Sequence, residues 1–231
     1  MPKTNYKTLA ALNKAVSACR TCPRLVAWRE EVASVKRAAY RDEDYWGKAV
    51  PSFGDPKAHL LIAGLAPAAH GANRTGRMFT GDRSGEWLFR ALHRAGFANQ
   101  PTYEYRNDGL KLTGAYITNI VRCAPPANKP LTSERDHCLP YFHQELDLLK
   151  NLKTILCLGS FSWQGVLSIL ASRGQVTKPK LKFGHAATAQ VGPYTLIGSY
   201  HPSQQNTFTG KLTQPMFDDV FKKAREVIQS L

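Results

Sequence analysis

The chain has 231 residues, and 43% of them are hydrophobic, which suits one packed domain and argues against disorder. It contains no run of about 18 apolar residues, so we expect no membrane span. The first 14 residues carry scattered lysines without the apolar stretch of a secretory signal. We therefore expect a single domain over residues 1–231, in the cytoplasm.

Charge and cysteine content narrow the function classes. Lysine and arginine total 31 against 17 acidic residues, which gives a formal net charge of +14 that is spread along the chain. Such an excess favours a polyanionic partner such as nucleic acid, because cations release the counterions of phosphates. Five cysteines in a cytoplasmic chain favour metal or redox chemistry over a disulfide framework.

Helix and strand patterns alternate along the chain. Apolar residues at helical spacing predict two N-terminal helices, one ending near Cys19 and one with a stripe over residues 25–39. Four apolar runs predict strands at 59–66, 116–121, 154–159 and 194–200. Further helices are expected at 84–94, 161–171 and 215–231. Another helix is expected to begin at a capping box formed by Ser133 and Asp136.

This order predicts an α/β fold, a three-layer α/β/α sandwich around a four-stranded, mostly parallel sheet. In such sheets ligands bind at the carboxyl ends of the strands. Three unusual segments follow those ends: Gly64-Leu65-Ala66-Pro67, Asn119, and His201-Pro202-Ser203. We expect them to form one site.

Four of the cysteines fall in two separated pairs. Cys19 and Cys22 form a CxxC motif, Cys123 follows the second predicted strand, and Cys138 lies in the next helix. Four thiolates suit either a tetrahedral zinc ion or a [4Fe–4S] cube, and the spacing does not choose between them. Cys157 lies inside an apolar strand and is expected to be an ordinary core residue.

The segment from Gly64 to Gly85 is a glycine-rich loop without a nucleotide-binding or nucleophile-elbow motif. Arg74 and Arg77 are candidate phosphate contacts. Phe79 is a large apolar side chain in a polar loop, so it either anchors the loop to the core or stacks on a flipped base.

His201 follows the last predicted strand among polar neighbours. It is either a hydrogen-bond donor to a developing anion or a surface histidine. Candidate phosphate contacts in the same segment are Ser203, Asn206, Thr209 and Lys211.

Taken together, these motifs resemble the uracil-DNA glycosylase superfamily, and specifically its family 5, the iron–sulfur branch of bacteria and archaea. The resemblance runs from Cys19 to about Thr213. It rests on GLAPAAHG with RTGRMFTGD, on HPS with NTFTGKLT, and on the order of the cysteines. It implies a [4Fe–4S] cluster on Cys19, Cys22, Cys123 and Cys138, and hydrolysis of the N-glycosidic bond of uracil in DNA, with tolerance for other deaminated bases such as hypoxanthine.

The resemblance also implies roles for single residues. Phe79 would stack on the base in a pocket that includes Gly64 and Leu65, Asn119 would read its edge, and His201 would stabilise the departing base. Ala66 stands where most of the superfamily places Asp, Asn or Glu to orient water. Candidates to hold that water are Asn73, Asp82 and Asn119; we favour Asn119 with His201 and keep Asp82 as a third.

We expect a monomeric, monofunctional glycosylase that acts on chromosomal DNA in the nucleoid, because no lysine stands out as a Schiff-base nucleophile. Two alternatives remain open. One is a non-catalytic nucleic-acid-binding protein with a structural metal cluster, which the alanine at position 66 favours. The other is a redox or electron-transfer iron–sulfur protein, which leaves the basic charge and the two loops without a role.

Overall fold

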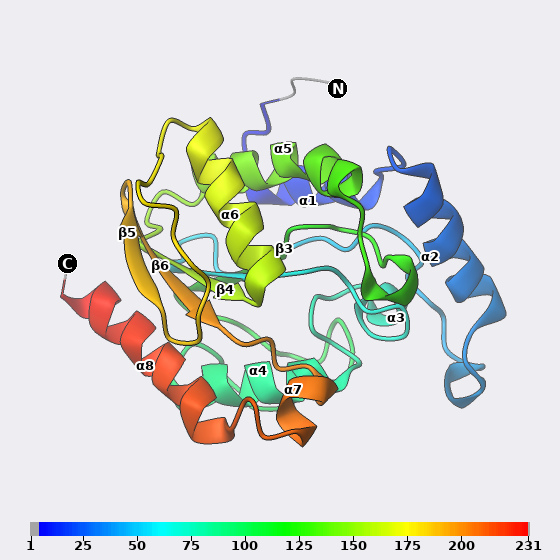
Figure 1. The fold of residues 1–231 in the computed structure, drawn as a ribbon. Helices are drawn as coiled ribbons and strands as arrows, with labels where there is room; N and C mark the ends of the chain where they lie inside the picture. Colours follow the sequence, from blue (N-terminus) through cyan, green and yellow to red (C-terminus); the bar gives the residue numbers. More distant parts are fainter. Residues whose placement is uncertain (1–4, 231) are drawn as a thin grey trace.

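The computed structural model describes residues 5–230 and folds as a three-layer α/β/α sandwich (Figure 1). The strands are β1 (Phe53–Gly54), β2 (Leu60–Gly64), β3 (Ala115–Asn119), β4 (Thr154–Leu158), β5 (Thr188–Val191) and β6 (Tyr194–Ser199). The helices are α1 (Leu9–Ser17), α2 (Pro23–Val35), α3 (Ala72–Thr75), α4 (Arg83–Arg94), α5 (Thr132–Leu148), α6 (Ser160–Ser172), α7 (Gln204–Phe208) and α8 (Gln214–Gln229). Short 3₁₀ turns lie at Ala38–Tyr40 and Pro126–Asn128. Among these residues no helix is both long and apolar enough to cross a membrane.

The sheet confirms the predicted α/β sandwich but has six strands rather than four, in the order β1-β3-β2-β4-β6-β5. The four predicted strands form its parallel centre, and β1 and β5 pair antiparallel at the two edges. The edge strands lack the continuous apolar runs of the centre, because β1 spans two residues and β5 is partly exposed. Continuous apolar runs in the sequence therefore predicted the four buried central strands but not the two edge strands.

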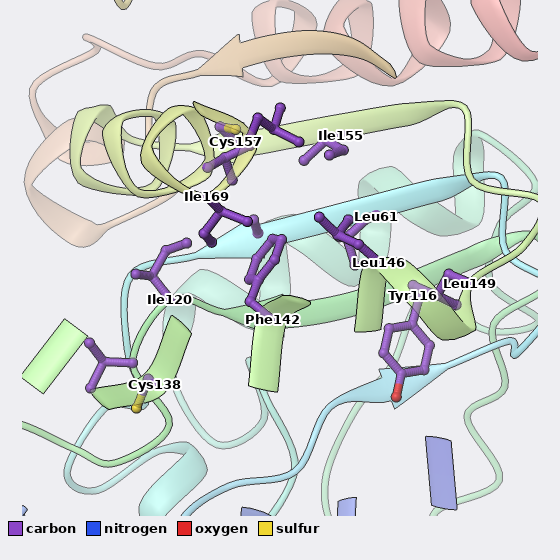
Figure 2. Packing of buried hydrophobic residues seen from close by; sticks show 14 of the residues in the cluster. Leu61, Tyr116, Ile120, Cys138, Phe142, Leu146, Leu149, Ile155, Cys157 and Ile169 are labelled. Atoms are coloured by element: carbon purple, nitrogen blue, oxygen red, sulfur yellow. The ribbon is translucent and has the colours of Figure 1, made fainter. Parts of the chain in front are cut away.

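Each face of the sheet has its own apolar core. Helices α1, α5 and α6 cover one face, and α4 and α8 cover the other (Figure 1). Figure 2 shows the first core, in which Phe142 of α5 points toward the strand that carries Leu61. Cys157 is fully buried in this core, which confirms its expected structural role.

Some helix ends differ from the expected ones. Helix α2 ends at Val35 because Lys36 has a positive φ of 57°, so the apolar stripe does not continue helically to Ala39. Helix α5 begins one residue before Ser133, and the predicted capping box of Ser133 with Asp136 is wrong. The carboxylate of Glu134 caps the helix instead, accepting a hydrogen bond from the Leu131 amide at 2.7 Å. Helix α8 ends at Gln229, and Leu231 lies outside the described residues.

A buried ion pair joins the layer of α5 to the sheet. The Arg122 guanidinium donates to Glu145 at 2.7 Å, and both side chains are at most 1% exposed. Thr118 donates to the same carboxylate at 2.8 Å, and Ser52 bonds to both charged groups. Burial of the two charges is tolerated here because the pair is direct and Ser52 and Thr118 add hydrogen bonds to it, although Arg122 Nε has no partner among the described residues.

Arg122→Met should therefore lower the free energy of unfolding by about 3–5 kcal/mol, because it leaves Glu145 buried without its counter-charge. The double variant with Glu145→Leu should recover most of that loss, since both charges are then removed together. Urea unfolding of the wild type, the single and the double variant measures this. A single variant within about 1 kcal/mol of the wild type would contradict it.

Candidate active site

A cavity of about 590 Å³ opens at the carboxyl ends of the parallel strands. The segments that follow β2, β3 and β6 meet there, as the sheet topology requires. Of the residues proposed from the sequence, the cavity brings together Leu65, Ala66, Phe79, Asp82, Asn119, His201 and Ser203.

The floor of the cavity depends on the pairing of Gly64 with Asn119 at the ends of β2 and β3. A Cβ atom at position 64 would lie 2.3 Å from Asn119 Oδ1 and 2.8 Å from the Phe79 ring, so only glycine fits. Asn119 is 2% exposed, and its Oδ1 has no hydrogen-bond partner among the residues described. An unpaired buried acceptor costs about 1–3 kcal/mol, which a ligand N–H would relieve.

Phe79 forms one wall. Its ring is 7% exposed and belongs to the core under α4, so the core-anchor interpretation holds for one of its faces. The residue has a positive φ of 55°, a conformation that is uncommon outside glycine and asparagine. His201 lies beside it, with the ring centroids 6.0 Å apart and the planes 27° from parallel. The two rings are stacked in this wall, which brings an aromatic and an imidazole side chain together at the cavity.

His201 is held by its backbone, which leaves the imidazole free toward the cavity. Its carbonyl oxygen accepts a hydrogen bond from Asn206 Nδ2 at 2.9 Å, and Ser203 caps the N-terminus of α7. Burial lowers the pKa of His201 from 6.5 to about 4. The ring is therefore neutral at pH 7, with one N–H donor and no positive charge.

Asp82 is the acidic residue of the lining. It caps α4 by accepting a hydrogen bond from the Ser84 amide at 2.8 Å, which confirms that it leads into that helix. Burial raises the pKa of Asp82 above its ordinary value, and the amides of Ser84 and Gly85 oppose that rise. Asp82 is thus both a helix cap and a cavity carboxylate.

Asn73 does not reach the cavity, which removes it as a candidate to hold water. It is fully buried, and its Nδ2 donates to the backbone oxygen of Arg29 at 3.2 Å. Ala66 does line the cavity and brings no polar atom to it beyond its backbone.

The side chains of Arg74 and Arg77, which we expected to contact phosphates, are buried and paired with acidic residues within the protein. Arg77 is 2% exposed and forms a two-pronged ion pair with Asp108 at 2.6 and 2.7 Å. Arg74 is buried against Glu43 and stacks on Tyr40. Both residues hold the loop in shape. Lys211, by contrast, is exposed beside the Tyr200 ring.

Several residues that line the cavity were not predicted from the sequence: Arg83, Ser84, Ala127, Asn128, Gln204 and Gln205. Ala127 and Asn128 both have a positive φ, at 52° and 56°. The prolines at 125, 126 and 130 were the available signal, because a proline-rich turn directly after a strand end fixes the chain across that edge.

The four cysteines also meet, in a second and much smaller cavity lined by Cys19, Cys22, Cys123 and Cys138. Burial raises the pKa of Cys123 to about 11 and that of Cys138 to about 12 as free thiols. The Arg29 guanidinium donates to Cys123 Sγ at 2.9 Å. Among residues 5–230, no three His, Cys, Asp or Glu side chains converge closely enough to hold a single metal ion.

The fold and the site define an α/β protein whose cavity, at the carboxyl ends of its parallel strands, contains an aromatic side chain, an unpartnered amide oxygen and a neutral imidazole. Comparison with known proteins gives the family. Residues 51–225 match the model of the "Uracil DNA glycosylase superfamily". The chain belongs to this superfamily.

Named relatives extend the likeness over nearly the whole chain. A "Type-5 uracil-DNA glycosylase" of Mycobacterium tuberculosis is 51% identical over 222 residues, which are 95% of this chain and 82% of the relative. Proteins with the same name from Thermus thermophilus and Pyrobaculum aerophilum are 46% and 40% identical, over 94% and 92% of this chain and 97% and 90% of theirs.

The low pKa of His201 has a measurable consequence. Between pH 6.5 and about 4 the unfolded chain binds a proton at this residue that the folded chain does not. Folding stability from His201 is therefore fully present above pH 6.5 and is lost as the pH falls through the folded-state pKa. An NMR titration with ¹³C-labelled histidine, assigned through His201→Asn, should give a midpoint near 4. A midpoint at or above 6.5 would contradict the lowered pKa of the half-buried imidazole.

Proposed function

We propose that this protein is a monofunctional uracil-DNA glycosylase, which hydrolyses the N-glycosidic bond of uracil in DNA and so initiates base-excision repair. The observation that carries the proposal is the buried, unpartnered Oδ1 of Asn119 at the floor of a cavity walled by Phe79 and His201. The pyrimidine edge of uracil presents an N–H between two carbonyl groups, and an asparagine amide can match it with one acceptor and one donor. The names of the relatives agree with this substrate.

Binding begins with extrusion of the base from the duplex, which costs a few kcal/mol and least at a mismatch. Phe79 then stacks on the base while Asn119 reads its edge. As the bond between the sugar C1′ and the base nitrogen breaks, its electron pair moves onto the base. The N–H of His201 donates to the oxygen that gains this charge. Because the contact is stronger in the transition state than before it, it accelerates bond cleavage.

The attacking water has two candidate partners. Its oxygen bonds to C1′ and it releases a proton, while the base anion later takes a proton from solvent. Ala66 offers no carboxylate for the released proton. Asn119 can hold the water by a hydrogen bond, and Asp82 can accept the proton, since it lines the cavity with a pKa raised by burial. None of the described lining residues is a lysine, so strand cleavage through a Schiff base is not expected.

The breadth of the cavity favours a second substrate. Ala66 leaves room beside the base, and about 590 Å³ accommodates a purine as well as a pyrimidine. Hypoxanthine should therefore also be excised, and the same excision assay with an oligonucleotide that contains hypoxanthine measures this. One chain supplies the whole site, so the protein acts as a monomer on chromosomal DNA of the nucleoid. Ser203 and Lys211 lie near the cavity as candidate backbone contacts.

A [4Fe–4S] cluster on Cys19, Cys22, Cys123 and Cys138 completes the proposal. Two observations fit this donor set. The first is that the four cysteines line one small cavity, and four thiolates are the ligand set of a [4Fe–4S] cluster. Arg29 is 1% exposed and forms no ion pair with a carboxylate among the described residues, so ionised thiolates would supply its missing counter-charge. Bound there, the cluster would act as a covalent cross-link between the start of α2, the segment after β3, and α5.

His201→Ala should lower the single-turnover rate of uracil excision about 100-fold or more, as expected for loss of one preorganised donor, with little change in DNA affinity. The assay uses a uracil-containing oligonucleotide, cleaved with alkali after the reaction. His93→Ala, at an exposed position of α4, is the matched control and should keep wild-type rates. Wild-type chemistry in His201→Ala would make His201 structural, and an inactive wild type would remove the glycosylase proposal.

Protein purified without oxygen should contain about four irons per chain. Cys22→Ser should lose iron and unfold at a lower temperature, because the cross-link to α2 is lost. Cys157→Ala is the control, since Cys157 lies in the core away from the cysteine cavity, and it should retain iron. One zinc and no iron per chain would contradict the cluster but leave a four-cysteine site.

A further inference from the structure

Burial of Arg74 and Arg77 means that other cations must supply part of the DNA contact. A surface cleft of about 360 Å³, the basic cleft, lies between α1, the start of α2 and the segment before β1. Its lining consists of Lys14, Ser17, Ala18, Arg20, Arg29, Trp46 and Lys48. Four of these seven residues are cationic and none is acidic, so the cleft suits an anion.

The two lysines are the free charges of the basic cleft. Arg20 is already paired with Glu30, whose second oxygen lies 3.0 Å from its guanidinium. Lys14 and Lys48 are exposed, and neither forms an ion pair within residues 5–230. Lys48 stands 5.4 Å from the centre of the Trp46 ring.

Arg29 adds a buried positive charge behind them. It is 1% exposed and donates to Cys123 Sγ and to the Cys19 backbone oxygen, both at 2.9 Å. Its Nε has no hydrogen-bond partner among the described residues. These contacts direct the Arg29 charge toward the cysteine cavity, so the free positive charge of the basic cleft comes from the two lysines.

The basic cleft is connected to the base cavity through α3. The amides of Trp46 and Gly47 donate to the carbonyl oxygens of Arg74 and Asn73, at 2.8 and 3.0 Å. Both acceptors belong to α3, whose first residue, Ala72, lines the base cavity. One helix therefore separates the two sites. A helix is about 10–12 Å across, and successive phosphates of one strand advance about 3.4 Å along the duplex.

We propose that the basic cleft binds a phosphate of the DNA backbone about three nucleotides from the extruded base, with Lys14 and Lys48 as its contacts and Trp46 as an apolar wall against the sugar. The inference rests on the proposed function for the identity of the DNA. It adds a contact region that neither the loop motifs nor the base cavity supplies.

The test compares two double variants that each remove two exposed lysines. Lys14→Ala with Lys48→Ala empties the basic cleft, and Lys57→Ala with Lys111→Ala removes the same charge near the amino ends of β2 and β3, on the opposite edge of the sheet. Affinity for an undamaged duplex is measured against salt concentration. The cleft variant should have a log–log slope shallower by about 0.9, for the one phosphate contact that is lost.

The control pair should stay close to the wild-type slope, and Lys14→Arg with Lys48→Arg should restore it. The excision rate at saturating enzyme should be unchanged in the cleft variant. Equal slopes for the two alanine pairs would overturn the proposal. A second outcome would also overturn it. Inorganic phosphate could raise the melting temperature of the wild type and not that of the cleft variant, while the salt slope for DNA is the same in both. The cleft would then bind only a free anion. Binding to an undamaged duplex does not require base excision. The salt slope therefore tests the basic cleft even if the protein proves to have no glycosylase activity.

Discussion

The site depends on one pairing, that of Gly64 with Asn119 where β2 and β3 end side by side. The missing side chain at position 64 leaves space for the Asn119 amide and for the Phe79 ring, and it keeps the amide oxygen buried without a partner. Any larger residue at this position would push one of the two aside. The parallel register of the central strands then brings the His201 loop to the same edge.

Charge is organised in three ways around this site. Arg122 is neutralised by Glu145 inside the core, and Arg77 and Arg74 are neutralised by acidic partners that fix the loop after β2. Arg29 has a thiol and a carbonyl oxygen as its hydrogen-bond acceptors, which ties it to the cysteine cavity. The cations that remain outside ion pairs among the described residues include exposed lysines and Arg83, which lines the base cavity, so only part of the net charge of +14 is available to bind DNA.

The sequence was sufficient for the central strands, because buried parallel strands are continuous apolar runs, and for the members of the site, because strand ends in such a sheet share one edge. It was insufficient where a partner is distant along the chain. Arg77 looked free because Asp108 lies 31 residues away, and the two together are nearly solvent-excluded. Two other failures are local: the edge strand β1 has only two residues, and α5 starts one residue earlier than expected, so that Glu134 rather than Ser133 caps it by a contact with the Leu131 amide.

The central claim is that the Asn119 amide receives the edge of an extruded uracil. A structure of the protein with duplex DNA carrying 2′-fluoro-deoxyuridine tests it most directly, because the electron-withdrawing fluorine slows departure of the base. We expect the uracil ring stacked on Phe79, its N–H within about 2.7–3.2 Å of Asn119 Oδ1, and His201 beside a base oxygen. A base that stays stacked in the duplex, or one that enters the cavity with its edge turned away from Asn119, would contradict the account.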